Sequence, residues 1–326
     1  MKFAVLSLNP GIDRVLYLSN GLNAGGMNRL SRSVTSQGSK GANVAIMLKR
    51  LGCDVEYYSF TGGYYGAICD SFTEREGVKS FLVETGCGVR LNTKVIDGNG
   101  VCTELNERGG KYTEEEARKL IRLFEASDAD VVCLCGSIPQ GVENFVYNLL
   151  ISTAKNKNKR TVLDCDGLAF SAGMNAFPNL IKPNLYELTG FGVSTGMFGN
   201  FSTDVEKQRQ EVTEACGKVR ENYGTDVLCT LGGDGAIAVT GDGVYDCPAL
   251  KLELKGFSGA GDCFLSGYLA AKYDRRADTR EALISATACA AAKVSLEGTL
   301  LPDRALVEQF AARVRSEWDA RDNSKN

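Results

Sequence analysis

The sequence predicts an α/β fold, in which a mostly parallel central sheet lies between two layers of helices and a small additional β-sheet is attached. Beyond about residue 107, short buried apolar runs alternate with segments of helical spacing, which is typical of consecutive strand–helix units. The N-terminal third instead contains short alternating segments interrupted by Asn, Gly and Asp. The 326 residues are 44% hydrophobic and 24% charged, a composition typical of a globular protein.

The elements of the larger sheet follow one another along the chain. Thr113 and Glu116 form a capping-box pattern that predicts a helix start, and Leu120 and Phe124 continue it at helical spacing to about Ser127. The apolar runs that we assign to strands are 130–134, 161–163, 180–181 and 227–229. The other segments of helical pattern are 145–150, with Phe145, Val146, Leu149 and Leu150 as its buried stripe, 203–223, 260–273, 280–296 and 303–320.

The N-terminal third predicts the small sheet. The segments 14–18, 27–36 and 89–101 have the short alternating pattern of antiparallel strands. A helix is predicted between them at 42–51. We infer one domain over residues 1–326, with the small sheet formed from about residues 12–36 and 88–108.

The absence of histidine excludes several kinds of catalytic site. The chain has no His, 37 Lys and Arg, and 40 Asp and Glu, which gives a net charge of -3. It therefore cannot use a Ser-His-Asp triad, a Cys-His pair or a zinc helix with two histidines. Catalysis must rest on carboxylates, cations, hydroxyls, thiols, backbone amides and a bound metal.

Charge and hydropathy indicate where the protein works. The mild net acidity is unlike the basic stripe of a nucleic-acid-binding protein. The chain starts on the strand-like segment 3–6 without a leader pattern, and no apolar run approaches the roughly 18 residues of a membrane span. We therefore expect a cytoplasmic protein with neither a nucleic-acid nor a membrane partner.

The 12 cysteines are expected to be free thiols, because no secretory pattern and no C-x-x-C pair accompanies them. Cys133 and Cys135 alternate along a predicted strand, which places both on one face as small core residues. Cys263 follows a glycine-rich turn. It is the thiol that we expect near the chemistry, as a neighbour of the reacting groups.

The glycine-rich turn runs from Gly256 to Asp262, directly into the helical segment 260–273. Small residues let backbone N–H groups converge, and a helix N-terminus adds positive charge, so the turn can bind an anion. Asp262 would stand beside that anion, although Asp at a helix start is also an ordinary capping residue. The turn has neither the Gly-Lys-Ser/Thr ending of a Walker A loop nor the glycine spacing of a dinucleotide fingerprint.

A second polar segment, Lys182 to Glu187, follows the strand 180–181. Pro183 favours an extended exit from the strand, and Asn184 and Glu187 then lie one turn apart at a helix start. Two hard oxygen ligands in this position suit Mg²⁺ held mostly through water. A capping box between the same two residues is an equally natural interpretation.

Two N-terminal segments carry cations. The turn 38–45 brings amide donors, Lys40 and Asn43 to a helix start, which suits a polyol or a phosphate but is also compatible with an ordinary loop. The period of two in the strand 90–94 places three polar side chains on one face, Arg90, Asn92 and Lys94. A solvated strand face would look the same, but with Arg29 and Lys40 these cations suffice to bind a dianion.

Taken in order, these motifs resemble the phosphofructokinase B group of ribokinase-like sugar kinases. The resemblance covers residues 5–298 and is carried by Asn9 to Asp13, Gly38 to Ala45, Arg90-x-Asn92-x-Lys94, Gly136 to Pro139, Lys182 to Glu187, Thr230 to Gly235 and Gly259 to Asp262. Within the group, the Asn-Pro start, the lysine-bearing turn and the Arg-x-Asn-x-Lys strand resemble the branch of 1-phosphofructokinase and tagatose-6-phosphate kinase. The substrates of that branch already bear a phosphate.

The resemblance implies a ribokinase-like α/β/α sandwich whose small sheet is a lid, which commonly also makes a homodimer contact. It implies ATP as phosphoryl donor, Mg²⁺ as metal, and Asp262 as the base that takes the proton of the acceptor hydroxyl. It also implies an anion hole for the transferring phosphoryl group at Gly259, Ala260 and Gly261, and Mg²⁺ binding at Asn184 and Glu187. The sugar would be bound by Asp13, Gly38, Lys40, Asn43, Asn92 and Ser137, and the phosphate of the sugar by Arg29, Arg90 and Lys94. The nucleotide would be bound by Lys182, Thr230, Gly232, Gly235 and Ser258.

Three places depart from the family pattern. Ser39 replaces the second glycine of the usual pair and would be strained if that backbone needs a positive φ. Phe257 stands where Thr is usual, and Ser295 to Gly298 stands where an Asn-x-Gly is expected near the adenine.

The resulting hypothesis is ATP- and Mg²⁺-dependent phosphorylation of the C6 hydroxyl of fructose 1-phosphate. A tagatose-6-phosphate kinase or a broader hexose-phosphate kinase is the alternative among enzymes, because each needs one dianion site and one aligned hydroxyl. A sensor that binds sugar phosphate and nucleotide without turnover is the alternative of another class, and the complete turn with Asp262 counts against it. Phosphoryl transfer relies on positioning and charge neutralisation, so a chain without histidine can perform it.

Overall fold

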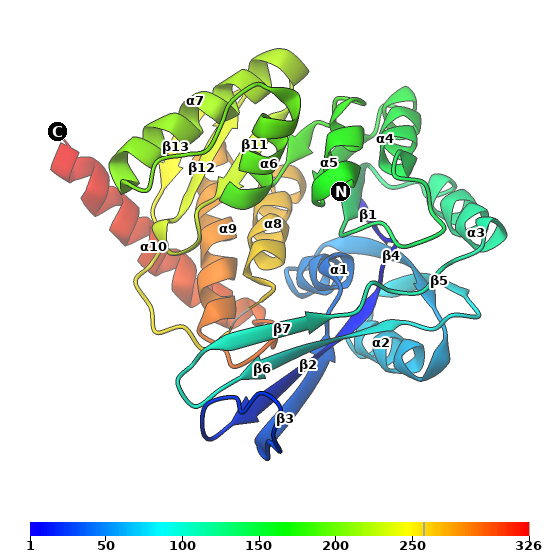
Figure 1. Ribbon diagram of the computed structural model, residues 1–326. Helices are drawn as coiled ribbons and strands as arrows, with labels where there is room; N and C mark the ends of the chain where they lie inside the picture. Colours follow the sequence, from blue (N-terminus) through cyan, green and yellow to red (C-terminus); the bar gives the residue numbers. More distant parts are fainter. Residues whose placement is uncertain (257, 326) are drawn as a thin grey trace.

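The computed structural model describes residues 1–256 and 258–325 and contains a large and a small sheet (Figure 1). The strands of the large sheet are β1 (Lys2–Ser7), β4 (Asp54–Thr61), β5 (Lys79–Glu84), β8 (Val131–Cys135), β9 (Arg160–Asp164), β10 (Leu180–Ile181), β11 (Asp226–Thr230), β12 (Ala236–Thr240) and β13 (Gly243–Cys247). They pair in the order β13-β12-β11-β10-β9-β8-β1-β4-β5. All neighbours are parallel except β11 with β12 and β12 with β13. The predicted mostly parallel sheet is confirmed.

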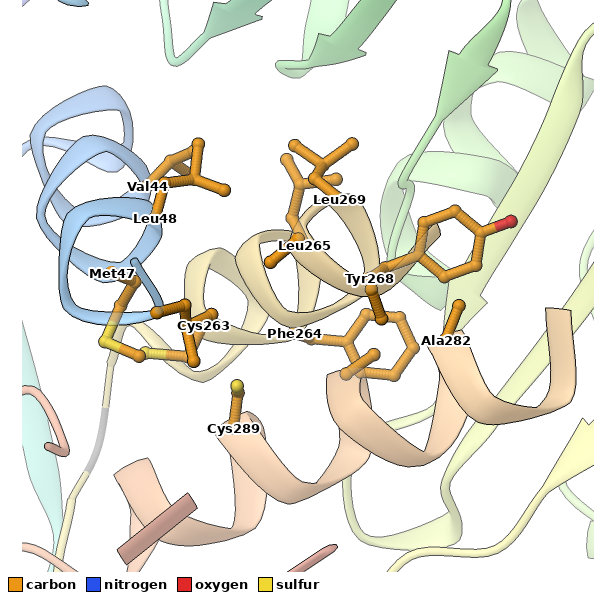
Figure 2. Packing of buried hydrophobic residues seen from close by; sticks show 14 of the residues in the cluster. Val44, Met47, Leu48, Cys263, Phe264, Leu265, Tyr268, Leu269, Ala282 and Cys289 are labelled. Carbon is orange, nitrogen blue, oxygen red and sulfur yellow. The ribbon is translucent and has the colours of Figure 1, made fainter. Parts of the chain in front are cut away.

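Helices cover both faces of this sheet. One face carries α1 (Lys40–Arg50), α8 (Ala260–Leu269), the π-helical turn η2 (Ala270–Asp274), α9 (Thr279–Val294) and α10 (Arg304–Lys325). The other carries α3 (Glu114–Glu125), α4 (Val146–Asn156), α5 (Gly167–Met174), α6 (Leu185–Thr195) and α7 (Val205–Tyr223). Figure 2 shows α8 lying between α1 and α9.

The alternation of side chains along β1 explains the two cores. Phe3 and Val5 are fully buried against one helical layer, and Ala4 and Leu6 are fully buried against the other. A strand that is apolar on both faces has to be central in a covered sheet. The neighbours of β1 lead away in opposite directions, because β4 lies on one side of it and β8 on the other. Such a switch point opens a crevice at the carboxyl ends of the strands, where ligands bind.

The small sheet has the strand order β3-β2-β6-β7 and comes from two separate parts of the chain. Its strands are β2 (Gly11–Leu18), β3 (Leu30–Gln37), β6 (Arg90–Ile96) and β7 (Cys102–Asn106). Figure 1 shows it as a separate layer below α1, α8 and α9, next to α2 (Gly63–Arg75). Val89 and Ile12 pack with Cys69 of α2 beneath it.

The pairing within the small sheet corrects one expectation. β2 with β3 and β6 with β7 are antiparallel as predicted, but β2 and β6 run parallel. The chain passes through α1, β4, α2 and β5 between β3 and β6. That long excursion lets it re-enter the sheet in the direction of β2, which a short hairpin could not do.

The predicted stripe of α4 is also partly wrong. Val146 and Leu150 are buried, but Phe145 is 59% exposed and Leu149 is 50% exposed. Tyr147 takes part in the buried face instead, and its hydroxyl donates to the carbonyl oxygen of Gly136 at 3.0 Å.

Within the described residues, no helix combines the length and the apolar character that crossing a membrane requires.

Candidate active site

A cleft of about 720 Å³ lies between the carboxyl edge of the large sheet and the small sheet. It is lined by most of the residues proposed from the sequence, namely Asp13, Gly38, Lys40, Asn43, Asn92, Lys94, Lys182, Asn184, Glu187, Thr230, Gly232, Gly235, Ser258, Gly259, Ala260, Gly261 and Asp262. These residues come from six separate stretches of the chain. The fold therefore gathers in one cleft what the sequence presents as separate motifs.

The glycine-rich turn ends as an open helix N-terminus. Gly259 is the N-cap of α8 with a φ of 84°, a left-handed conformation that glycine adopts without strain. The first helical hydrogen bond runs from the Cys263 N–H to the Gly259 carbonyl at 3.0 Å. The N–H groups of Ala260, Gly261 and Asp262 thus have no helical acceptor and can bind an anion. Phe257, which departs from the family pattern, lies outside the described residues.

Asp262 is buried in the first turn of α8 at 6% exposure and accepts a hydrogen bond from Asn43 Nδ2 at 2.8 Å. Burial, with the nearby Asp164 carboxylate, raises the pKa of Asp262 to about 6, while Lys40 and Asn43 act in the opposite sense. A carboxylate with a raised pKa is a better proton acceptor than an exposed one. The thiol of the next residue, Cys263, points into the core between α1 and α9 (Figure 2), so it is a neighbour in sequence only.

Two lysines and a buried aspartate form a charged cluster beside the turn. Lys40 Nζ lies 3.3 Å from Asp164 Oδ1 and 3.4 Å from Glu187 Oε1. Lys182 Nζ lies 3.4 Å from the same Asp164 oxygen. Burial opposes ionisation of Asp164, but the two ammonium groups outweigh it and hold the pKa of Asp164 below its usual value. Burial likewise opposes the charge of Lys40, but the surrounding carboxylates raise its pKa well above the usual value.

The Lys182 to Glu187 segment forms the capping box that was one of its two interpretations. Asn184 Oδ1 accepts from the Glu187 N–H at 2.8 Å, and Glu187 Oε2 accepts from the Asn184 N–H at 2.9 Å. Capping uses the single side-chain oxygen of Asn184 and one carboxylate oxygen of Glu187, and the second Glu187 oxygen contacts Lys40. The cap thus leaves one carboxylate oxygen of Glu187 in a fixed orientation, and the assignment of Mg²⁺ to Asn184 and Glu187 stays a prediction.

The site fits Mg²⁺ held partly by water. Asp164 Oδ2 is buried and has no hydrogen-bond partner, and Glu187 lies near it across Lys40. Carboxylate oxygens are the ligands that Mg²⁺ prefers. Among the described residues, no group of three His, Cys, Asp or Glu side chains is arranged to hold a metal by itself. This donor set suits an ion that keeps several waters and binds phosphate oxygens.

The small sheet supplies a buried ion pair on the opposite side of the cleft. Lys94 Nζ lies 2.8 Å from Asp13 Oδ2, and both side chains are 7% exposed. Asn92 Nδ2 donates to Asp13 Oδ1 at 3.1 Å. Gly38 must be glycine here, because a Cβ at this position would lie 2.6 Å from the Asp13 backbone nitrogen. Ser258 Oγ donates to Asp13 at 3.5 Å and so joins the sheet to the glycine-rich turn.

Ser39 is not strained. Its φ is -99° and its ψ is 128°, so the backbone at this position does not need glycine. Its side chain caps α1 by accepting from the Ala42 N–H at 3.5 Å and shares a hydrogen bond with Ser7 Oγ at 2.6 Å. The departure from the family's glycine pair is accommodated as a helix cap.

We expect Ser39→Ala to lower the free energy of unfolding by about 1 kcal/mol, because the cap and the bond to Ser7 are lost. Ser39→Gly should lower it less, since glycine is itself an acceptable N-cap. Urea denaturation of the two variants checks this order. A larger loss for glycine than for alanine would contradict the capping role.

Three predicted residues are not gathered in the cleft. Arg29 is exposed on the loop between β2 and β3. Arg90 Nη1 donates to the Glu107 carbonyl at 3.2 Å, and Ser137 Oγ accepts from Asn9 Nδ2 at 3.0 Å. None of the three lines the cleft. Their assignment to the substrate stays a prediction.

The far end of the cleft combines a glycine turn with apolar walls. Thr230 ends β11, and the turn η1 (Gly232–Asp234) follows it. Apolar side chains also line the cleft, among them Leu250, Leu252 and Val294 of α9. Glu297, at the position that departs from the family pattern, pairs with Arg32 of β3 at 2.6 Å. That segment thus contacts the small sheet.

Five acidic or polar side chains in or beside the cleft were not identified from the sequence. Glu104 and Asn106 of β7, Asp166 after β9 and Thr287 of α9 line the cleft, and Asp164, the last residue of β9, is buried against the cleft residues Lys40 and Lys182. The position of Asp164 at the carboxyl end of a buried strand was a usable signal, because the carboxyl ends of parallel strands share one edge. The β7 residues gave none, since an exposed edge strand has the same polar pattern.

Comparison with known proteins agrees with this arrangement. The sequence profile of the pfkB family carbohydrate kinases matches residues 8–305. The chain is 31% identical over 266 residues to a 1-phosphofructokinase of Bacillus subtilis, covering 81% of this chain and 84% of that one. It is 30% identical over 295 residues to a 1-phosphofructokinase of Haloferax volcanii, covering 90% of this chain and 92% of that one.

Solved structures share the fold. Phosphofructokinase-2 of Escherichia coli, in complex with substrates and products, superposes with a TM-score of 0.87 at 24% identity, covering 97% of this chain and 100% of that one. A possible 1-phosphofructokinase of Thermotoga maritima gives a TM-score of 0.81 at 23% identity, covering 96% and 98%. The profile match over most of the chain, with both cores and the cleft in place, leads to one conclusion: the chain belongs to the pfkB family of carbohydrate kinases, which are phosphotransferases with an alcohol group as acceptor.

Proposed function

We propose that the protein transfers the γ-phosphoryl group of ATP to the C6 hydroxyl of fructose 1-phosphate, giving fructose 1,6-bisphosphate and ADP. One observation carries the proposal: a single cleft joins a buried carboxylate with a raised pKa, an open helix N-terminus and, on the small sheet, the buried pair of Lys94 with Asp13. The relatives named 1-phosphofructokinase support this choice of acceptor.

Asp262 acts as the general base. Its carboxylate takes the proton of the C6 hydroxyl as the oxygen attacks the phosphorus, and Asn43 holds it in place through the bond to Oδ2. The free N–H groups at the start of α8 bind the equatorial oxygens of the transferring group, where negative charge is spread in the transition state. Lys182, whose Nζ would be 3.2 Å from a Cβ on Gly261, adds a positive charge beside the same turn.

Mg²⁺ neutralises charge on the phosphates of ATP when it is bound. Asp164 and Glu187 would hold it, with Asn184 orienting Glu187 through the cap. Lys40, which contacts both carboxylates and lines the cleft, supplies a positive charge on this side of it. Asp13, Asn92 and Lys94 bind the sugar phosphate from the opposite wall.

A coupled assay of ADP release tests the proposal. Fructose 1-phosphate, tagatose 6-phosphate, fructose 6-phosphate and free fructose are compared at equal concentration with ATP and Mg²⁺. We expect the highest kcat/KM with fructose 1-phosphate. A preference for tagatose 6-phosphate would assign the alternative kinase, turnover with free fructose alone would exclude a sugar-phosphate acceptor, and no turnover with any of them would favour a sensor.

The pKa of Asp262 predicts the pH dependence of turnover. Because burial raises it to about 6, the carboxyl is protonated below that pH and cannot accept a proton. We expect kcat at saturating substrates to be constant above about pH 7 and to fall roughly tenfold for each pH unit below about 6. The second ionisation of the sugar phosphate, also near pH 6, should affect KM instead. An acid limb confined to KM would contradict the assignment.

The proposal extends to assembly and location. We propose a homodimer through the small sheet, supported by exposed apolar side chains there, Leu30 on β3 and Leu105 on β7. Light scattering after size exclusion measures the mass directly. A cytoplasmic location is supported by the cysteines, all of which are free thiols.

A further inference from the structure

A lysine is completely buried beneath the glycine-rich turn. Lys293 lies in the last turn of α9 with no exposed surface, and its Nζ donates to the Gly298 carbonyl oxygen at 2.9 Å. Among the described residues no carboxylate forms an ion pair with it. Burying a cation without a paired anion is costly, so an ordinary core position would not favour lysine.

The side chain of Lys293 runs directly under the turn. A Cβ on Gly256 would lie 2.7 Å from Lys293 Nζ, and a Cβ on Gly259 would lie 3.5 Å from Lys293 Cε. The carbonyl oxygens of Leu296 and Gly298 would lie 2.8 and 3.0 Å from that Gly256 Cβ, so they surround the same point. The turn and the segment after α9 therefore meet at the ammonium group.

Backbone pairing fixes the same junction. The Lys255 N–H donates to the Val294 carbonyl at 2.8 Å, and the Gly298 N–H donates to the Lys255 carbonyl at 3.2 Å. Gly256 and Gly298 form an isolated parallel bridge. This pairing brings carbonyl oxygens together on the side of the junction that faces Lys293. An ammonium group suits that place, because it donates hydrogen bonds and accepts none.

Burial disfavours the charge of Lys293, and acidic groups on the side of the turn offset that effect in part. Burial lowers the pKa of Lys293 and Lys94 lowers it further, whereas Cys263, Asp262 and Asp13 act in the opposite sense. Two of these groups, Asp262 and Asp13, line the cleft. Phosphate groups bound at the turn would add further negative charge on that side.

We propose that Lys293 is a positioning residue for phosphoryl transfer, a built-in cation that holds the glycine-rich turn against the segment after α9 and stabilises negative charge bound at the turn. The proposal rests on the phosphoryl transfer proposed above. Lys293 is fully buried and does not line the cleft, so it acts from beneath the turn. It acts through Gly256 and Gly259, which leave the space that its side chain fills.

Lys293→Ala and Lys293→Met test the proposal together. Both are expected to lower kcat by about 10²-fold, as when one preorganised donor of an oxyanion site is removed, with KM for the sugar phosphate within threefold of wild type. Alanine leaves a hollow lined by carbonyl oxygens, which methylammonium can enter. Methylammonium should therefore raise the kcat of Lys293→Ala about tenfold. Methionine fills the hollow, so that variant should not respond. Wild type with methylammonium, and the alanine variant with tetramethylammonium at equal ionic strength, are the controls.

Three results would overturn it: a kcat of Lys293→Met within threefold of wild type, equal recovery of both variants in methylammonium, or no recovery of Lys293→Ala. Should the alanine variant fail to fold, the kcat of the methionine variant decides. If the wild-type protein does not phosphorylate fructose 1-phosphate, that result contradicts the proposed function and not the role of Lys293. The role of Lys293 is then tested by calorimetry with ATP and ADP. We expect the difference in affinity between the two nucleotides to be smaller in Lys293→Met than in wild type, and an unchanged difference would overturn the proposal.

Discussion

Asp262→Asn is expected to lower kcat by about 10²- to 10⁴-fold and to leave KM for both substrates within a few-fold of wild type. The amide has nearly the shape of the carboxylate and can still contact Asn43, but it cannot accept the proton of the hydroxyl. The N–H groups of the α8 start remain in place, so phosphates can still bind. Steady-state kinetics with the coupled assay measures both parameters.

Asp54→Asn is the matched control, because Asp54 is an exposed carboxylate at the start of β4 and does not line the cleft. It should behave as wild type. The Asp262 variant should also lose the acid limb near pH 6 in its residual kcat. Near-normal turnover of Asp262→Asn, or an acid limb that persists in it, would remove Asp262 from the role of base.

Lys94→Met is expected to lower the free energy of unfolding by about 3 kcal/mol and to weaken sugar-phosphate binding strongly. Removing one member of a buried pair leaves the other charge without its partner, which is the costly case. Here the Asp13 carboxylate would keep only the bonds from Asn92 and Ser258. Urea denaturation and calorimetric titration with fructose 1-phosphate measure the two effects.

The double variant Asp13→Asn with Lys94→Met separates charge from packing. Because it removes both charges, it should be more stable than Lys94→Met alone, while still failing to bind the sugar phosphate. Arg118→Met breaks the exposed pair with Glu114 and should change stability by less than about 1 kcal/mol. If Lys94→Met were as stable as this control, the pair would not hold the wall of the cleft.

The sequence predicts the fold well for strands that are buried on both faces of the sheet. A run such as 131–135 is apolar at every position, so its place inside a covered parallel sheet follows from composition and length. The parallel pairing of β2 with β6 does not follow in this way. It depends on how the chain returns after β5, and the alternating pattern of each strand is the same for both directions.

The site was predictable where one short segment carries it. The turn before α8 and the capping box at Asn184 can be recognised from local spacing alone. Lys40 illustrates the limit, because its position between Asp164 and Glu187 depends on three segments of different elements. Lys293 illustrates it further: a lysine near a helix end normally reaches solvent, and only the packed fold buries it.

The distribution of thiols gives the protein an intrinsic reporter of unfolding. Ten of its cysteines are buried, Cys102 is half-buried and Cys87 is exposed. Burial raises the pKa of thiols such as Cys133 and Cys263, which keeps them protonated and unreactive in the folded state. A thiol reagent should therefore modify Cys87 quickly and the buried ten only when the cores open. Counting modified thiols over time would follow the opening of both helical layers, without any engineered probe.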